Sequence, residues 1–484
     1  MNRRLGRDIW QRARNAGRVV VALCTFYAFH CTAEDWPKYR RDLSNTGKSA
    51  ETGITSANVA SLQERWHFAT GGRVTASPAV ATVGGISTLY IGAWNGVFYA
   101  LNAVNGAKRW SFTLDSVGQC TPGVCRIGSS AAVDVSTNTV YFGARNAYLY
   151  ALNASNGALK WKQQVGDPSS HEVWSSPAVY NGRVYVGISS HGDIPCIVGR
   201  VDAYTASTGN LDWSFKTIDQ STCPGCVGGS VWSSLAIDSD NGIVYADTGN
   251  PGSTCQPPTA NADLYPDSVL ALDADTGVLL NYFKAIGNDL NDKDFGSSPV
   301  LHSTQIDNEC TNTTINEDWV TAVSKNGYAF TLKRDAGGLT GAQQANFLNN
   351  AGAIATPAVR PRPAVSSCAA GLRLITRKNN IYVPASNGAL FNLLQDENGD
   401  IAVQGKVKVA TVPIFSAPAV IKDVMIFGSA DGNLHIHKVP YGGTAALRVI
   451  PIGSEIDSGP AISNSRIYFG ANDGNLYCYS LNGN

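Results

Sequence analysis

The sequence predicts an all-β fold, an eight-bladed β-propeller. Three observations predict it: one short phrase recurs eight times, each copy opens the same series of four strands, and the strand missing after the last copy stands before the first. Repeats at a regular period are typical of solenoids and propellers, and four antiparallel strands make one propeller blade. A β-sandwich would not account for eight copies of one four-strand phrase.

The recurring phrase reads Ser-Pro-Ala-Val or a close variant. Its copies begin at residues 77, 130, 176, 234, 298, 356, 417 and 459. A second apolar strand follows each copy, as at residues 89–92, and then a turn such as Asn95 and Gly96, whose residue types accept positive φ and close hairpins. A third strand alternates in polarity, as at residues 98–101. The fourth strand ends in tryptophan in the first three copies, at Trp110, Trp161 and Trp213.

The ring is predicted to close by pairing the two chain ends. The eighth copy stops at Asn484 after its third strand, and a segment typical of the fourth strand, residues 62–68, precedes the first copy. We expect this N-terminal strand to complete the last blade and to leave no open sheet edge.

Composition excludes some classes of function. Lys plus Arg and Asp plus Glu number 37 each, so the net charge is zero and no basic stripe indicates binding to nucleic acid. Charged residues make up only 15% of the chain, and the many glycines suit short strands joined by tight turns. After residue 33 no stretch is long and apolar enough to predict a membrane helix.

The first 33 residues have the features of an export signal. Six arginines precede an apolar run at residues 19–29, which is too short to span a bilayer, and small residues follow it. We therefore expect a signal peptide over residues 1–33, a propeller over residues 34–484, and a periplasmic or secreted location. An uncleaved anchor and lipid attachment at Cys31 are the open alternatives.

The cysteines suggest disulfides. Nine of the eleven follow residue 33, and the odd number leaves at least one thiol unpaired. Cys223 and Cys226 have redox-motif spacing, but they lie in a loop between blades, so we interpret them as a structural disulfide. A disulfide between Cys120 and Cys125 would stiffen the loop before Arg126. No Cys-x-x-Cys-His motif occurs, so no covalently bound c-type haem is expected.

Long insertions interrupt blades three to five. They cover residues 191–199, 219–229, 250–266 and 302–317. Long loops on a rigid scaffold are where functional residues concentrate, so we expect the site on this side of the ring.

The repeats resemble those of the quinoprotein alcohol dehydrogenases, whose cofactor is pyrroloquinoline quinone (PQQ), and in particular the polyvinyl alcohol dehydrogenase branch. The likeness covers nearly all of the chain after residue 33, and residues 53–66 and 292–299 carry it most clearly. It implies a quinoprotein-type propeller. Polyvinyl alcohol dehydrogenases usually also carry a haem domain, and because the Cys-x-x-Cys-His motif is missing we expect the resemblance to cover the propeller alone. The repeats alone are a weak guide to catalysis, because scaffold propellers of the outer-membrane assembly lipoprotein kind share them without a cofactor.

The resemblance implies a cofactor site built from several blades. Arg126 stands where the family places an arginine on a cofactor carboxylate, which a planar guanidinium binds bidentately. Trp232 stands where a tryptophan forms the floor under the flat quinone, and Ser230 adds a hydrogen bond to the cofactor. Each of these residue types is also common in propeller loops and cores, so the combination carries the prediction.

The resemblance also implies two catalytic residues. Asp294 matches the general base that removes the hydroxyl proton of an alcohol. Lys325 matches a cation that hydrogen-bonds the quinone oxygens and stabilises the charge that develops there. Alone, Asp294 would be interpreted as a structural residue of an acidic loop.

A calcium ion is implied with less support. Asn250 and Asp294 match two of its ligands, but the family's third-blade glutamate is missing, and Asp193 is the nearest carboxylate that would replace it. Calcium prefers oxygen ligands and would polarise the quinone.

Three functions follow from these residues. The first is an alcohol dehydrogenase acting on a secondary or polymeric alcohol such as polyvinyl alcohol, or on a sugar, with electrons passing to a soluble cytochrome c or another acceptor. The second is a scaffold propeller that binds a protein partner without a cofactor. The third is a degenerate quinoprotein that binds the cofactor without turnover.

Overall fold

The computed structural model describes residues 34–115, 125–192, 195–251, 265–287, 289, 291–308, 313–346, 355–361, 365–369, 372–440 and 445–482. Residues from Glu34 onward form one compact unit. The expected signal peptide lies outside the described residues. Within the described ranges, no helix has the length and apolarity needed to cross a membrane.

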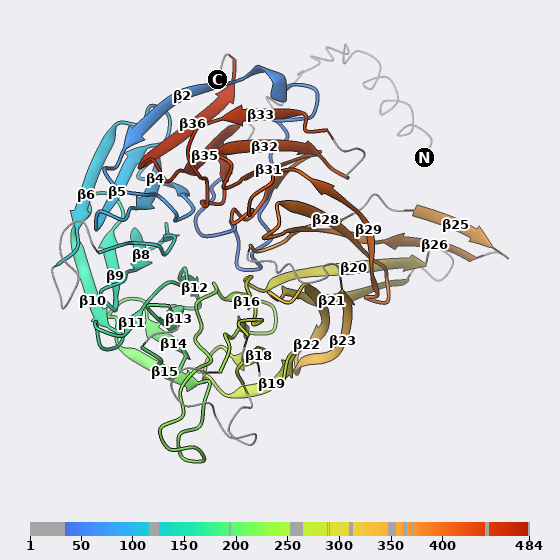
Figure 1. Ribbon diagram of the computed structural model, residues 1–484, viewed down its shortest axis with the longest axis horizontal. Coiled ribbons are helices and arrows are strands. Elements are labelled where there is room, and N and C mark those ends of the chain that lie inside the picture. The colour runs from blue at the N-terminus through green and yellow to red at the C-terminus, as the bar shows by residue number, and fades with distance from the viewer. Residues whose placement is uncertain are drawn as a thin grey trace, which may run out of the picture. The chain divides into compact units, whose positions relative to one another are not determined.

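The described strands form eight sheets that follow one another around a ring (Figure 1), as the sequence predicts, and every pairing in them is antiparallel except that of β1 with β30. Blade 1 contains β3 (Ala79–Val83), β4 (Ile86–Gly92), β5 (Val97–Asn102) and β6 (Lys108–Thr113). Blade 2 contains β7 (Ala132–Asp134), β8 (Thr139–Gly143), β9 (Tyr148–Asn153) and β10 (Leu159–Gln164). Blade 3 contains β12 (Ala178–Tyr180), β13 (Arg183–Ser190), β14 (Arg200–Thr205) and β15 (Leu211–Lys216), with the short β11 (His171–Glu172) added beside β13. Blade 4 contains β16 (Ala236–Asp238), β17 (Ile243–Asp247), β18 (Ser268–Asp273) and β19 (Leu279–Lys284).

The remaining blades complete the ring. Blade 5 contains β20 (Val300–Asn308), β21 (Thr313–Val323), β22 (Tyr328–Asp335) and β23 (Gly338–Asn346), extended by β25 (Val365–Ala369) and β26 (Leu372–Arg377). Blade 6 contains β24 (Ala358–Pro361), β27 (Asn379–Pro384), β28 (Ala389–Gln395) and β29 (Ile401–Lys408). Blade 7 contains β30 (Ala419–Ile421), β31 (Val424–Gly428), β32 (Asn433–Lys438) and β33 (Arg448–Pro451), beside β1 (Lys48–Ser49). Blade 8 contains β34 (Ala461–Ser463), β35 (Arg466–Gly470) and β36 (Asn475–Leu481).

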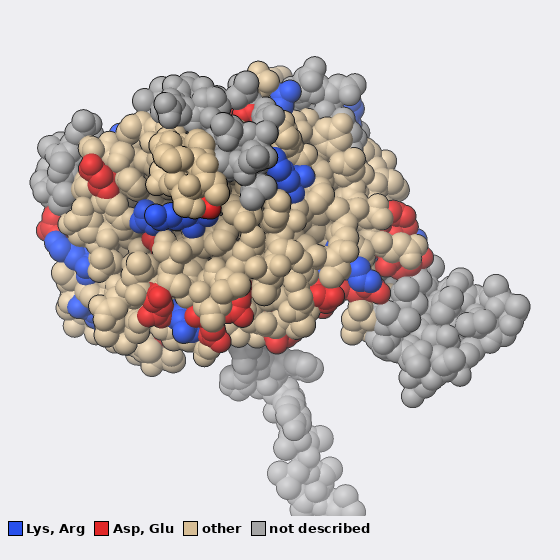
Figure 2. All heavy atoms as spheres, turned by 90° about the horizontal axis from the view of Figure 1, so that it is seen from below, with Lys and Arg blue, Asp and Glu red and all other residues tan. Residues whose placement is uncertain are grey.

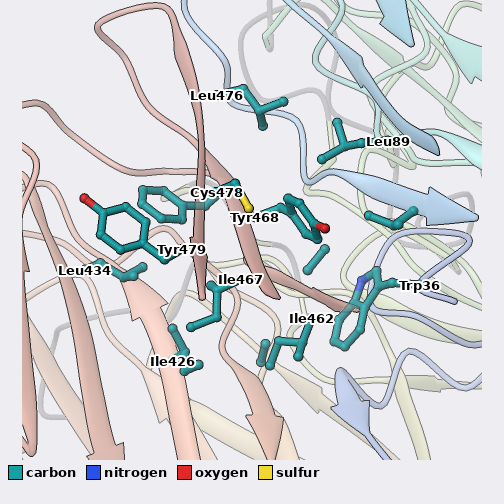
Figure 3. Close-up of a cluster of buried hydrophobic side chains, with 14 of the residues drawn as sticks. Trp36, Leu89, Ile426, Leu434, Ile462, Ile467, Tyr468, Leu476, Cys478 and Tyr479 are labelled. Atoms are coloured by element: carbon teal, nitrogen blue, oxygen red, sulfur yellow. The ribbon is translucent and has the colours of Figure 1, made fainter. Parts of the chain in front are cut away.

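The chain ends close the ring as predicted. Strand β2 (Leu62–Ala69), which follows a short 3₁₀ helix at Val59–Ser61, pairs antiparallel with β36 and becomes the fourth strand of blade 8. Trp66 stands opposite Cys478 in this register, and Cys478 is a free, buried thiol, so the expectation of an unpaired cysteine is confirmed. Figure 3 shows Cys478 beside Tyr468 in the hydrophobic cluster that joins blades 7, 8 and 1.

Tryptophans of the outer strands join blades 1, 2 and 3 each to the blade that follows. Trp110 of blade 1 packs against Gly157 of blade 2, where a Cβ would lie 2.6 Å from the indole and φ is +75°, so only glycine fits. The indole nitrogen donates to Ala154 O at 3.0 Å, and the hydroxyl of Tyr90 donates to the same oxygen at 2.9 Å. Blades 2 and 3 repeat this contact through Trp161 and Trp213.

The first residue of each repeated phrase forms a ring of hydrogen bonds around the axis. The Ser77 N–H donates to the Ser130 hydroxyl, and the same step recurs from blade to blade until Thr356, at 2.9 to 3.1 Å. The Gly459 N–H donates to the Ser77 hydroxyl at 3.0 Å. Ala417 and Gly459 lack a hydroxyl, which explains why the ring stops short of closing.

Residues 34–49 form a segment across one end of the axis that the sequence analysis did not predict. Its carbonyls accept the N–H groups of the innermost strands of blades 1, 2, 4, 5 and 7 at 2.8 to 2.9 Å. The Lys38 ammonium donates to Asn45 Oδ1 at 2.7 Å, and the Asn45 amide donates to Leu235 O and Pro299 O. In each of these repeats, the strand residue that this segment bonds to comes after the residue of the hydrogen-bonded ring, whereas the inter-blade loop comes before it. The segment and the inter-blade loops therefore lie at opposite ends of the axis.

The blade-5 insertion differs from expectation. Residues 302–317 were expected as a loop, but most of them continue β20 and β21 as one long hairpin, paired from Val300↔Thr321 to Asn308↔Thr313. Strand β26 joins β20 on its other side, and β25 and β26 project outward from the ring (Figure 1). Pairing of β20 with β26 stabilises the hairpin. The local sequence of residues 302–317 did not reveal this partner, because β26 lies more than fifty residues further along the chain.

The inter-blade contacts make a testable prediction about stability. Tyr90→Phe removes a buried hydroxyl whose acceptor, Ala154 O, keeps the bond from Trp110. We therefore expect the free energy of unfolding to fall by about 1 kcal/mol, the usual net value of a hydrogen bond, as measured by urea denaturation. Tyr148→Phe is the control, because its hydroxyl bonds to Gln164 at the surface. An equal loss in both variants would contradict the role of the contact.

Candidate functional site

Two positions of the repeat supply the side chains at the mouth of the ring. The first lies four residues before the first residue of the repeated phrase, which is called the ring residue because it belongs to the ring of hydrogen bonds. Residues at this position include Arg73, Arg126, Glu172, Ser230, Asp294 and Glu455. The second lies in the turn between the second and third strands. Its backbone N–H donates to the carbonyl of the first position in the same blade, from Gly249 to Ser230 O at 2.8 Å and from Lys325 to Asp294 O at 2.8 Å. This repeated bond explains why residues distant in sequence meet here.

Asp294 and Lys325 form an ion pair inside the ring. Lys325 Nζ lies 2.6 Å from Asp294 Oδ1 and 2.5 Å from Asp292 Oδ1. The Asp294 side chain is 2% exposed, whereas that of Asp292 is 59% exposed. Burial raises the pKa of Asp294 to about 6, although Lys325 acts in the opposite direction. Burial also lowers the pKa of Lys325, but the two carboxylates more than offset this effect and leave it above its ordinary value.

Trp232 lies against this pair. Its indole nitrogen donates to Asp294 Oδ2 at 3.4 Å, and Lys325 Nζ lies 5.2 Å from the centroid of its ring. The ammonium therefore contacts both a buried carboxylate and an aromatic face, which is a favourable place for a cation. The arrangement fixes the orientation of the indole.

A cavity of about 220 Å³ opens beside the pair. Five of the predicted residues line it, which are Ser230, Trp232, Asn250, Asp294 and Lys325. Gly249 also lines it, and a Cβ there would lie 3.1 Å from Asp294 Oδ2, so the glycine keeps that oxygen accessible from blade 4. The sequence-predicted residues of blades 4 and 5 are thus brought together.

One predicted residue, Arg126, does not line this cavity, and another, Asp193, lies outside the described residues. The Arg126 guanidinium instead makes a bidentate pair with Glu172 at 3.0 and 2.8 Å. The Glu172 side chain is 1% exposed and that of Arg126 is 12% exposed, so each charge is neutralised inside the protein.

The described oxygen ligands alone are too few for calcium. Calcium takes about six to eight oxygens, and one oxygen of Asp294 is held by Lys325 while Asn250 contributes one amide oxygen. Across the part of the chain that the structure describes, no group of three His, Cys, Asp or Glu residues is arranged to hold a metal ion.

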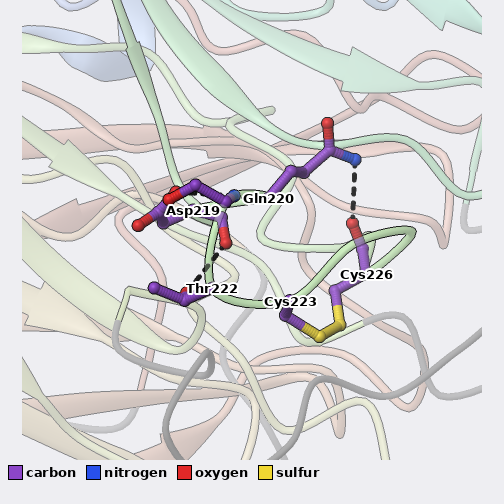
Figure 4. Close-up of a disulfide and its surroundings, with 6 residues drawn as sticks. Asp219, Gln220, Thr222, Cys223 and Cys226 are labelled. Carbon is purple, nitrogen blue, oxygen red and sulfur yellow. Dashed lines mark hydrogen bonds between the residues drawn. A yellow bond between two sulfur atoms is a disulfide. The ribbon is translucent and has the colours of Figure 1, made fainter.

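Backbone bridges join the inserted loops of blades 3 and 4. Gly228 bridges to Val198 on one side and to Pro251 on the other, which connects three of the insertions. The disulfide between Cys223 and Cys226 lies just before Gly228, and the Gln220 amide donates to Cys226 O (Figure 4). The structural disulfide predicted from sequence is therefore confirmed. Cys125 is also disulfide-bonded, whereas Cys120 lies outside the described residues.

Charge is mixed over the face shown in Figure 2. Lysine, arginine, aspartate and glutamate are interspersed there, and no broad field of one sign covers that face. This agrees with the balanced composition of the chain.

The comparison with protein families decides the relationship. The family described as "PQQ: Glucose/ethanol/alcohol dehydrogenase, beta-propeller domain" matches residues 36–340. The chain belongs to this family.

Individual relatives agree with the family. A polyvinylalcohol dehydrogenase of Pseudomonas sp. is 25% identical over 310 residues, covering 57% of this chain and 46% of that protein. A quinohemoprotein alcohol dehydrogenase of Comamonas testosteroni is 29% identical over 276 residues, covering 50% of this chain and 38% of that protein. The chain therefore spans less than half the length of either relative in these matches.

Solved structures share the fold. The crystal structure of the Comamonas testosteroni quinohemoprotein alcohol dehydrogenase matches with a TM-score of 0.71 and 18% identity, over 93% of this chain and 81% of that chain. BamB from Moraxella catarrhalis matches with a TM-score of 0.55 and 13% identity, over 87% of this chain and all of that chain. At these identities the likeness shows the propeller fold alone.

Sequence analysis missed two residues of this region, Glu172 and Trp174. Glu172 ends the short strand β11, and Trp174 follows it in the link to β12. Glu172 precedes Ser176 by four residues, as Arg126 precedes Ser130 and Asp294 precedes Ser298. Aligning the repeats on their ring residues would have predicted that all three side chains face the mouth of the ring.

Proposed function

We propose that this protein is a PQQ-dependent alcohol dehydrogenase whose cofactor binds in the cavity beside Trp232. The observation that carries the proposal is the buried Asp294–Lys325 pair, which lies against Trp232 and lines one cavity with Ser230 and Asn250. Membership of the family supports the choice of cofactor.

The residues present fit a flat, oxygen-rich ring system. The indole of Trp232 offers aromatic stacking area, the Lys325 ammonium offers hydrogen bonds to ring oxygens, and the absent side chain of Gly249 leaves room beside Asp294. When bound, the quinone supplies the electrophilic carbonyl that accepts a hydride from the alcohol carbon.

Asp294 is the proposed general base. Its Oδ1 is held by Lys325, whereas from the described residues Oδ2 accepts only the 3.4 Å hydrogen bond of the Trp232 indole, so Oδ2 is the oxygen proposed to accept the hydroxyl proton of an alcohol in the cavity. Its raised pKa makes it a better proton acceptor than an ordinary carboxylate. Removal of this proton is the part of the conversion of an alcohol to a carbonyl compound that Asp294 would perform.

Lys325 is the proposed electrostatic partner. A cation fixed by two carboxylates is already oriented before the reaction, so it stabilises developing negative charge without reorganisation. Trp232 orients the cofactor by its aromatic face, and Ser230 adds a hydroxyl on the same cavity wall.

The finer parts of the proposal concern the ion, the substrate and the location. Asn250, Asp294 and Asp193 would be the protein ligands of a calcium ion, and none of the steps above depends on it. The substrate would be a secondary or polymeric alcohol, with electrons leaving to a soluble cytochrome c or a similar acceptor. The expected signal peptide supports a periplasmic or secreted enzyme.

The proposed base makes a prediction about pH. Because burial raises the pKa of Asp294 to about 6, activity should rise with pH and reach half its maximum near pH 6. An ordinary aspartate would put this midpoint at about pH 4. The pH profile of kcat/KM with a saturating electron-accepting dye measures it. A midpoint near 4 would mean that Asp294 is not the base.

Reconstitution tests the function. The purified protein is mixed with PQQ, with and without calcium, and dye reduction is followed with a panel of primary, secondary and polymeric alcohols. Alcohol-dependent dye reduction that requires PQQ would support the dehydrogenase. PQQ binding without turnover would indicate a degenerate quinoprotein, and no binding would leave the scaffold interpretation.

A further inference from the structure

We infer that Trp174 is a second aromatic wall of the proposed cofactor pocket, and that the ion pair between Arg126 and Glu172 positions it. The inference rests on the proposed function, because the ligand it concerns is the flat cofactor. It also assigns Arg126 a role different from the one the family resemblance implies.

Trp174 and Trp232 hold equivalent places in neighbouring blades. Each lies two residues before its ring serine, Trp174 before Ser176 and Trp232 before Ser234. Both line the cavity beside Asp294. Among the ring contacts of the described residues none joins the two indoles, so the space between them belongs to the cavity rather than to a stacked pair.

One face of Trp174 is already occupied. The guanidinium carbon of Arg126 lies 4.2 Å from the centroid of its ring, which is a close cation–π contact. Trp174 is nevertheless 37% exposed, and no other tryptophan among the described residues is as exposed. Because the cation covers one face and the residue lines the cavity, the free face is available to a flat ligand.

The cation that supports Trp174 is itself fixed. Glu172 holds the plane of the Arg126 guanidinium through two hydrogen bonds. Trp94 lies on the arginine as well, with its ring centroid 5.4 Å from the guanidinium carbon. Arg126 is thus fixed by one carboxylate and two aromatic rings within the protein, and this support keeps its guanidinium against the Trp174 ring.

The same backbone segment carries both parts of this wall. Glu172 belongs to β11, which pairs with Ser189 and Ser190 at the end of β13, and both serines line the cavity. Trp174 follows two residues later. Strand pairing, the ion pair and the cation–π contact therefore hold this part of the cavity wall together.

The affinity for PQQ should depend on this wall. Stacking of a flat heterocycle on an aromatic side chain is worth about 10- to 100-fold in affinity. We expect Trp174→Ala to weaken PQQ binding by about that factor, while Trp174→Phe retains most of the affinity. Arg126→Gln and Glu172→Gln should each weaken it less, because they loosen the indole without removing it.

A double-mutant cycle separates positioning from direct contact. If Arg126 acts through Trp174, the double variant Trp174→Ala with Arg126→Gln should bind PQQ no more weakly than Trp174→Ala alone. The trimethyl ester of PQQ should also lose the same factor as PQQ on Arg126→Gln. An additive double variant, or a loss seen with PQQ but not with its ester, would show that Arg126 binds a ligand carboxylate and would overturn the positioning role.

The measurement is a calorimetric titration of the purified protein, with circular dichroism to show that each variant is folded. Should Trp174→Ala unfold the protein, Trp174→Phe and Trp174→Leu provide the comparison, with only the leucine expected to lose affinity. If Trp174→Ala or Trp174→Leu binds PQQ as tightly as the wild type, this inference is overturned while the proposed function stands. Absence of binding by the wild type would overturn the proposed function, and this inference with it.

Discussion

Replacing Asp294 by asparagine is expected to lower the rate of alcohol-dependent dye reduction by about 10²- to 10⁴-fold, the usual contribution of a general base. Asparagine keeps the shape of the side chain and an oxygen for the Lys325 ammonium, but it does not accept a proton at neutral pH. The affinity for PQQ should therefore change by only a few-fold. Steady-state kinetics and a PQQ titration on the same preparation separate these two quantities.

Asp292→Asn is the matched control for this prediction. Asp292 contacts the same Lys325 ammonium at 2.5 Å, but its side chain is 59% exposed and its charge is screened by solvent. We expect its variant to keep turnover within a few-fold of the wild type. Equal losses in the two variants would indicate that Asp294 acts only through the local charge, and would contradict its role as a base.

Removal of the cation beside Asp294 is expected to have the second large effect. In Lys325→Met the buried carboxylate loses the partner that lowers its pKa, so that pKa should rise above about 6 by roughly one unit or more. Asp294 would then be largely protonated at pH 7, and turnover there should fall steeply. The pH profile of kcat/KM measures the shift of the acidic limb toward higher pH.

The Lys325 prediction has two controls. Lys325→Arg retains a cation and should retain most of the acidic limb near pH 6. Lys293→Met removes an exposed lysine from the same loop as Asp294 and should leave the profile unchanged. An acidic limb that stays near pH 6 in Lys325→Met would mean that the ion pair does not set the pKa of the base.

Much of the fold was predictable because the repeat is local. Each copy of the phrase is an inner strand with its own hairpin signals, and the segment before the first copy reads as the missing outer strand, which pairs with β36. The residues at 34–49 carry no such period. Their partners are the backbone edges of five different blades, so only the closed ring reveals where they bind.

The site was predictable only in part. Trp232, Asn250, Asp294 and Lys325 were placed by family resemblance, and the cavity brings them together. The partner of Arg126 was missed, because Glu172 lies 46 residues away in the next blade and pairs with it only across the blade interface. A resemblance assigns the position of a side chain, whereas its partner depends on what neighbouring blades present in this chain.

Titration of the purified protein with PQQ, with and without calcium and in parallel with Trp232→Ala, tests the central claim most directly. The account predicts saturable binding of one cofactor per chain, weakened by about 10-fold or more in Trp232→Ala because the aromatic floor is lost. The absence of saturable binding under both conditions, or equal binding by the wild type and Trp232→Ala, would contradict it.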